Sequence, residues 1–224
     1  MSDQKPALDQ PKSISSGTKA LVVAGVVAMA LAAVLYGKSG QGGKETASAC
    51  AASAAAAERI APLAKGQLAS LNVAKSPKPA TEIVFDGPSG EKLKLSEFRG
   101  KTVLLNLWAT WCVPCRVEMP ALDRLQGELG GKNFEVVAVN IDTARLERRK
   151  AFLDSVGVNK LAFYTDSKAD TFQVLKQAGK VIGLPTTILI DDKGCELGVM
   201  AGPAEWDGPE AVALLRAAMQ PSRP

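Results

Sequence analysis

Two of the four cysteines lie close together in the stretch NLWATWCVPCRVEMP, where Val113 and Pro114 separate Cys112 from Cys115. A pair at this spacing can hold half of a metal site, form a small structural disulfide or exchange electrons. Histidine is absent and there is no second CxxC motif, which disfavours a zinc site. A structural disulfide that closes so short a loop would stabilise the fold little. The pair is therefore predicted to be redox-active, with no metal bound.

The cysteine pair falls where a buried strand is predicted to end and a helix to begin. The continuous apolar run TVLLNLWA, residues 102–109, is typical of a central strand, and leucines at helical spacing follow from Leu122. At the start of a helix, unpaired amides and the helix dipole favour a thiolate at Cys112. Cys115 lies one turn further in and is expected to be more buried. We therefore predict that an exposed Cys112 attacks a disulfide and that Cys115 resolves the mixed disulfide.

Further strands and helices are predicted on both sides of this motif. They are a hairpin over 83–85 and 92–95, a strand over 134–141, a helix capped by Thr143 and stopped at Gly157, a helix over 167–178, a hairpin over 186–190 and 196–200, and a helix that Pro209 opens. This alternation predicts an α/β fold with a mixed central sheet flanked by helices.

The N-terminal residues differ in composition from the rest. Residues 20–37 carry no charge and as a helix would span about 27 Å, close to the hydrocarbon core of about 30 Å. We expect a cytoplasmic tail over 1–19, a transmembrane signal-anchor helix over 20–37, and an exported remainder, in a bacterial inner membrane with the catalytic domain in the periplasm. A cleaved signal peptide and a lipoprotein attached through Cys50 are the alternatives.

Between the anchor and the main domain, residues 38–75 are predicted to form a Gly-rich tether and an Ala-rich helix that extends to Val73. Residues 74–80 are expected to be an extended linker into a domain over 76–224.

Cys50 and Cys195 are isolated in the sequence. Exported chains rarely leave thiols free, so a structural disulfide between them is favoured over a lipidated Cys50 or two buried thiols. A bond that closes so long a loop could stabilise the fold by about 4 kcal/mol.

Composition excludes several other functions. The absence of histidine rules out Ser-His-Asp and Cys-His hydrolases. The net charge is only +4 and aromatics make up 5% of the chain. The longest basic run, over residues 148–150, is interpreted as a solvated helix face. No nucleic-acid partner is therefore expected.

Three stretches carry a resemblance to a known family: GEKLKLSEFRGKTVLLNLWATWC, CVPCRVEMP and IGLPTTILIDDKG. They resemble the thioredoxin superfamily, and within it the membrane-anchored TlpA-like thiol:disulfide interchange proteins of cytochrome maturation and oxidase assembly. The resemblance covers about residues 76–220. It implies a thioredoxin-like fold and a monomeric thiol:disulfide oxidoreductase, a protein-disulfide reductase with no cofactor beyond its redox-active disulfide.

The resemblance also assigns roles to individual residues. Pro185 matches the family's cis-proline, which would expose the Leu184 backbone so that an extended substrate can pair with it. Trp111, Val113 and Pro114, beside the reactive sulfur, are the other residues expected to contact substrate.

One position departs from ordinary thioredoxins, which keep a buried aspartate where this chain has Asn106. An asparagine cannot take up a proton. Glu118, in the family's CxxCxxExP pattern, is therefore the expected substitute, as a catalytic group that tunes thiol pKa values or carries protons.

The resemblance further implies the substrates and the electron source. Substrates would be exported cysteine-containing metalloproteins, such as cytochrome oxidase copper-site or cytochrome c haem-site precursors, or their copper chaperones. Electrons would come from a membrane dithiol donor.

Two alternatives remain open. A peroxiredoxin-like peroxidase would need threonine or serine where Ala109 stands. A non-enzymatic copper chaperone would use Cys112 and Cys115 as soft ligands.

Overall fold

The computed structural model describes residues 50–221, which belong to one unit, Thr46–Pro224. The predicted tail, the predicted membrane anchor, the predicted Gly-rich tether and the start of the predicted Ala-rich helix lie outside the described residues. Within residues 50–221, no helix combines the length and the apolar character that crossing a bilayer requires.

An eight-stranded mixed sheet organises the described residues, in the order β1-β8-β7-β4-β5-β6-β2-β3. Its central strand, β4, pairs in parallel with β5 and antiparallel with β7. The strands are β1 (Leu71–Pro79), β2 (Val84–Asp86), β3 (Lys92–Lys94), β4 (Thr102–Trp108), β5 (Phe134–Asn140), β6 (Tyr164–Thr165), β7 (Thr186–Ile190) and β8 (Cys195–Ala201).

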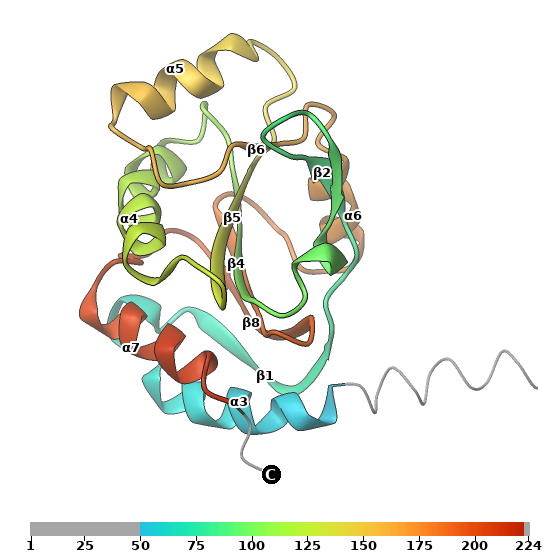
Figure 1. The fold of residues 1–224 in the computed structure, drawn as a ribbon, viewed down its shortest axis with the longest axis vertical. Coiled ribbons are helices and arrows are strands. Elements are labelled where there is room, and N and C mark those ends of the chain that lie inside the picture. Colours follow the sequence, from blue (N-terminus) through green and yellow to red (C-terminus); the bar gives the residue numbers. More distant parts are fainter. Residues whose placement is uncertain (1–49, 222–224) are drawn as a thin grey trace, which may run out of the picture. The chain divides into compact units, whose positions relative to one another are not determined.

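The helices flank this sheet. They are α3 (Ala54–Ile60), α4 (Val113–Leu129), α5 (Glu147–Ser155), α6 (Asp170–Gln177) and α7 (Pro209–Ala218), with short 3₁₀ turns at Ala51–Ser53, Ala61–Leu63, Gly66–Leu68 and Leu95–Phe98. In Figure 1, α4 and α6 lie on opposite sides of the central strands, and α3 and α7 lie together beside β1. The predicted α/β architecture with a mixed sheet is confirmed.

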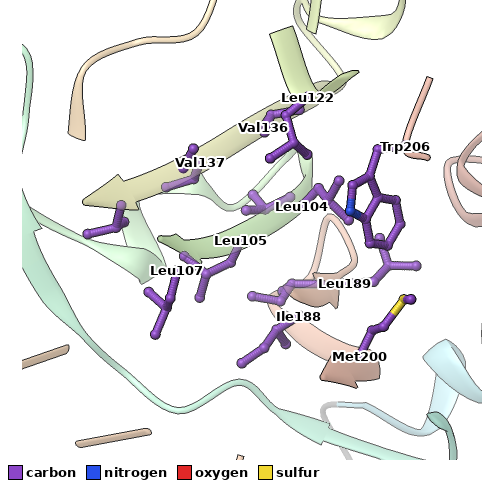
Figure 2. Packing of buried hydrophobic residues seen from close by; sticks show 14 of the residues in the cluster. Leu104, Leu105, Leu107, Leu122, Val136, Val137, Ile188, Leu189, Met200 and Trp206 are labelled. Atoms are coloured by element: carbon purple, nitrogen blue, oxygen red, sulfur yellow. The ribbon is translucent and has the colours of Figure 1, made fainter. Parts of the chain in front are cut away.

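The apolar sequence of β4 suits a strand at the centre of the sheet. Every residue of the strand is buried, because helices cover both faces and an apolar run satisfies both. Figure 2 shows Leu104, Leu105 and Leu107 of this strand among the side chains of the neighbouring strands, with Trp206 beside Leu104. This packing fixes the end of β4, where the cysteine motif begins.

The segment before the main domain differs from the prediction. Helix α3 ends at Ile60, and strand β1 occupies Leu71–Pro79, where the sequence predicted the end of a helix and a linker. The domain boundary predicted at residue 76 therefore falls inside a strand. Strand β1 lies at the edge of the sheet, so one of its sides has no neighbouring strand and proline is tolerated there. Its lysines and prolines therefore do not give the apolar pattern from which a strand is predicted. Its pairing with β8 is also irregular between Val73 and Lys78.

A second difference concerns the segment after β5. Helix α5 begins at Glu147, and Thr143 does not cap it. Arg145 has a φ of 54°, a left-handed conformation that interrupts helical geometry just before α5. The segment from Thr143 to Leu146 is therefore an exposed connection, at the end of the sheet where the cysteines follow β4.

Candidate active site

Strand β4 is joined to helix α4 by a tight turn. The N–H of Cys112 donates to the carbonyl of Ala109 at 3.1 Å, and Cys112 is the N-cap residue of α4. The sulfur of Cys112 accepts the N–H of Cys115 at 3.3 Å. An amide in this position, together with the helix dipole, would stabilise a thiolate at Cys112 after reduction.

Cys112 and Cys115 form a disulfide, with their Cα atoms 5.3 Å apart. Cys112 retains 6% of its surface and Cys115 none. Cys112 is thus the outer sulfur and Cys115 the inner one, although Cys112 is far less exposed than the sequence analysis expected. The reason is local: the side chain folds back over the first turn of α4, onto the amide of Cys115.

Exposed side chains adjoin the outer sulfur in the sequence, and another exposed side chain lies in the loop before β7. Trp111 is 68% exposed and Val113 67%, and Pro114 is also exposed. Ile182, in the loop before β7, is 87% exposed. Apolar groups that are left in water beside a reactive sulfur are suited to contact a polypeptide.

The loop before β7 contains a cis peptide bond between Leu184 and Pro185, the isomer that the resemblance implies. The carbonyl of Pro185 accepts the N–H of Gly202 at 2.9 Å. Within residues 50–221, the backbone N–H and C=O of Leu184 make no hydrogen bond to the protein. Leu184 therefore keeps both backbone groups available for an incoming strand.

Glu118 is buried behind the disulfide, with 3% of its surface exposed. It lies on the same helix face as Cys115, about one turn along α4. One carboxylate oxygen accepts the N–H of Ala204 at 3.1 Å and the indole N–H of Trp206. The other accepts the side-chain N–H of Asn106 at 3.1 Å. The carboxyl group is thus held by three donors.

Burial raises the pKa of Glu118 from 4.5 to about 7, although the hydrogen bonds from Ala204, Trp206 and Asn106 each act to lower that pKa. Desolvation penalises the charged carboxylate more than the three donors stabilise it. Glu118 is therefore able to gain or lose a proton near neutral pH, which suits an acid–base group.

Asn106 is fully buried on β4 and joins Glu118 to the neighbouring strand. Its amide N–H₂ donates to Glu118 and to the hydroxyl of Thr187 at 3.0 Å. Its carbonyl oxygen has no hydrogen-bond partner among residues 50–221. The asparagine that replaces the usual aspartate is thus in direct contact with the expected substitute.

Sequence reasoning missed Trp206, the backbone of Ala204 and Thr187 as partners of this network. Trp206 lies 88 residues from Glu118 in the sequence. No local pattern indicates such a contact, and tryptophan in a C-terminal segment is usually part of a core.

Cys50 and Cys195 are joined by a disulfide, the pairing that the sequence analysis favours, with their Cα atoms 5.7 Å apart. Each residue is only 1% exposed. The bond fixes the start of the described chain to the first residue of β8.

As for metals, no group of three or more histidine, cysteine, aspartate or glutamate side chains is arranged to hold an ion in the described part of the chain. The chemistry that the residues of this site support is that of the sulfur pair and one carboxyl group.

Comparison with known proteins places this chain in a family. Residues 75–215 match the Redoxin family. The chain is 42% identical over 108 residues to a thioredoxin-like protein, YneN, of Bacillus subtilis, covering 47% of this chain and 59% of that protein. It is 33% identical over 123 residues to the thiol-disulfide oxidoreductase ResA of the same organism, covering 55% of this chain and 65% of ResA. The chain thus matches less than two thirds of each relative's length.

A solved structure gives a fuller overlap. It is a putative thiol:disulfide interchange protein DsbE from Chlorobium tepidum, 32% identical with a TM-score of 0.54, and the match covers 63% of this chain and 96% of that one. The described fold is therefore thioredoxin-like, and the chain belongs to the Redoxin family.

Proposed function

We propose that this protein is a thiol:disulfide oxidoreductase that works as a protein-disulfide reductase. The observation that carries the proposal is the Cys112–Cys115 disulfide at the start of α4, with an outer and an inner sulfur. The relatives that are named thiol-disulfide oxidoreductase and thiol:disulfide interchange protein support this activity.

The reaction starts from the reduced dithiol. The thiolate of Cys112 attacks one sulfur of the substrate's disulfide, that bond breaks, and the other substrate sulfur leaves as a thiolate and takes a proton. Cys115 then loses its proton and attacks Cys112. The Cys112–Cys115 disulfide forms and the second substrate thiol is released. Two electrons have moved to the substrate, and a dithiol donor must supply two electrons to restore the pair.

Glu118 acts in the second step as the base for the Cys115 thiol. Its carboxylate is buried on the Cys115 face of α4, and its pKa of about 7 lies close to that of a thiol. A proton can therefore pass between the two groups without a large energetic penalty.

The substrate would lie across the exposed apolar side chains Trp111 and Val113, with Pro114 alongside. The unpaired backbone of Leu184, before cis-Pro185, offers one donor and one acceptor to an extended polypeptide. Such strand-like pairing is independent of the substrate's side chains, and a reductase with several protein substrates needs that tolerance.

The physiological setting is part of the proposal. The uncharged run over 20–37 would anchor the protein in the inner membrane, with the catalytic domain in the periplasm. A second disulfide away from the active site, Cys50–Cys195, supports an oxidising compartment. Substrates would be cysteines of exported metalloproteins that must be reduced before copper or haem is attached, and a membrane dithiol protein would supply electrons.

The reduction potential of the Cys112–Cys115 couple tests the direction of electron flow. Equilibration of the protein with a thiol redox buffer should give a potential near that of thioredoxin, about −270 mV, as a reductant requires. A potential near about −120 mV, typical of strong disulfide oxidants, would contradict the proposed direction.

A further inference from the structure

A basic groove lies immediately beside the active-site disulfide. It is a cavity of about 620 Å³ between the start of α4, the connection after β5, and α5. Figure 1 shows α5 near one end of α4. Its lining includes Trp111, Arg116, Thr143, Arg145, Arg148 and Phe152. The groove therefore starts at the residue before Cys112.

Aromatic packing holds one wall of the groove. The guanidinium of Arg116 lies over the ring of Phe152, 5.1 Å from its centre. The Phe152 ring in turn packs against Trp108 of β4, at 5.8 Å between ring centres. Arg116 is thus held against a ring that is itself anchored on the core.

The second part of the wall comes from the connection and α5. Arg145 and Arg148 are both exposed. Arg149, next in the sequence, instead lies over the ring of Phe163 and donates to the carbonyl of Leu146. The sequence analysis interprets the basic run over 148–150 as a solvated helix face. In the structure its residues differ: Arg148 lines the groove, whereas Arg149 packs on Phe163.

Within residues 50–221, no carboxylate forms an ion pair with Arg116, Arg145 or Arg148. Asp142, which precedes the lining residue Thr143, is buried, and its carboxylate accepts hydrogen bonds from the N–H of Thr110 and the side chain of Asn140 rather than from an arginine. Glu147, between Arg145 and Arg148 in the sequence, is exposed to water. Three arginines without an ion pair thus line one cavity.

The order of the strands places the groove opposite the cis-proline loop. Strand β4 lies between β7 and β5. Leu107 pairs with Thr186 at the start of β7, and Trp108 pairs with Asn140 at the end of β5. The Leu184 backbone and the groove therefore flank Cys112 on opposite sides, at the same edge of the sheet. A polypeptide substrate that crosses the Cys112–Cys115 disulfide would contact both the Leu184 backbone and the groove. A small-molecule disulfide would not extend across both.

We propose that this groove binds an acidic segment next to the disulfide of a polypeptide substrate, with carboxylates of the substrate pairing with Arg116, Arg145 and Arg148. The proposal rests on the proposed reductase function and names its substrate class. Arginine suits the role because its planar fork binds carboxylates bidentately.

The test uses the full-length protein in detergent, with Cys112 and Cys115 reduced beforehand by a dithiol and the excess removed, and three synthetic peptides with the same internal disulfide. The disulfide is flanked by two glutamates, two glutamines or two lysines, and the rate of reduction of each peptide is measured. At low ionic strength, the wild-type protein should reduce the glutamate peptide about three to ten times faster than the glutamine peptide, and the lysine peptide slowest. This preference should shrink at high salt.

The decisive variant is Arg145→Gln combined with Arg148→Gln, and its readout is the ratio of the glutamate rate to the glutamine rate. That ratio should fall to about one. The matched control is Arg99→Gln combined with Lys132→Gln, which removes the same two charges from exposed positions before β4 and β5, at the other end of the sheet. This control should keep the wild-type ratio.

Each other outcome has a defined meaning. A ratio of one in the wild-type protein, a preference that survives in the groove variant, or an equal loss in the control overturns the acidic-substrate proposal. The acidic-substrate proposal is also overturned if the wild-type protein reduces oxidised glutathione faster than an uncharged small disulfide and the groove variant does not. That result would assign the groove to small anions. Failure of the wild-type protein to reduce even the glutamine peptide contradicts the reductase function itself.

Discussion

At the scale of single residues, the surroundings of Glu118 set the pKa of its carboxyl group to a value that suits proton transfer. Its burial raises its pKa, and the donors on Ala204, Trp206 and Asn106 limit that rise. Because Asn106 also contacts Thr187, the carboxyl group is tied to β4 and, through it, to β7. The proton acceptor and the inner sulfur are thus fixed to the same rigid elements.

Replacement of Glu118 by glutamine tests its role as a base. The rate at which Cys115 displaces a thiol from Cys112 should fall by on the order of a hundredfold at pH 7, and the inflection near pH 7 should disappear. Stopped-flow measurement of single-turnover release across pH 5–9 reads both effects. An unchanged inflection in Glu118→Gln would assign the titration to another group.

The raised pKa of Glu118 also predicts how the free energy of unfolding depends on pH. The native state keeps a proton on Glu118 up to a pKa of about 7, whereas a glutamate in the unfolded chain has its ordinary pKa of 4.5. Between these pH values the native state binds more protons, so the free energy of unfolding should fall as pH rises, by up to about 3 kcal/mol. Urea unfolding at several pH values should show that the free energy of unfolding of Glu118→Gln does not fall in this way as pH rises. Glu58→Gln, at an exposed position, should keep this dependence on pH.

At this scale the sequence predicts local chemistry well and distant partners poorly. The spacing of Cys112 and Cys115 and the position of Glu118 follow from a short motif. The contact with Trp206 depends on how β8 and the following loop return to α4, which no nearby residue encodes. The limited exposure of Cys112 was also missed, because it depends on the side-chain orientation at a helix N-cap.

At the scale of elements, Asp123 connects α4 to the segment between α5 and β6. One oxygen accepts the backbone N–H groups of Asn159, Lys160 and Leu161, at 2.9, 2.6 and 3.0 Å. These residues lie in an irregular stretch without strand partners. The carboxylate therefore replaces the backbone pairing that the segment lacks.

Substitution of Asp123 by alanine should cost about 2 to 4 kcal/mol, because three amides would lose a charged acceptor. Asp154→Ala removes a carboxylate that pairs with Lys150 on the surface of α5 and should cost less than about 0.5 kcal/mol. Chemical denaturation of both variants gives the comparison. Equal costs would mean that Asp123 does not support the segment.

The Cys50–Cys195 disulfide links a helical segment to the sheet edge. It closes a separation of 145 residues. The double variant Cys50→Ser, Cys195→Ser should lose about 3 to 5 kcal/mol of stability, through the larger entropy of the unfolded chain. Disulfide exchange at Cys112 should persist below the new unfolding midpoint. Loss of exchange in a folded double variant would show that the two disulfides are coupled.

The continuous apolar runs of β4 and β5 and the helical spacing of leucines in α4 made these elements predictable from the sequence, whereas β1 and β6 were not. Strand β6 has only Tyr164 and Thr165, too few residues for a pattern. Strand β1 carries lysine and proline where a central strand would carry apolar residues. Edge strands satisfy fewer constraints, so their sequences reveal less.

At the scale of the whole molecule, the proposed membrane anchor and periplasmic catalytic domain predict where the protein is found in the cell. After cell fractionation, the full-length protein should remain with the inner membrane at high salt, and a version that begins at residue 46 should be released. Protease added outside spheroplasts should digest the catalytic domain. A full-length protein that is soluble without detergent would contradict the anchor.

The central claim is that Cys112 attacks and Cys115 resolves. Mass spectrometry of Cys115→Ser and Cys112→Ser after incubation with a neutral disulfide peptide tests this claim most directly. Cys115→Ser should retain one peptide strand linked to Cys112, whereas Cys112→Ser should retain none under the same conditions. Equal adduct yields on the two variants, or an adduct confined to Cys115, would contradict the account.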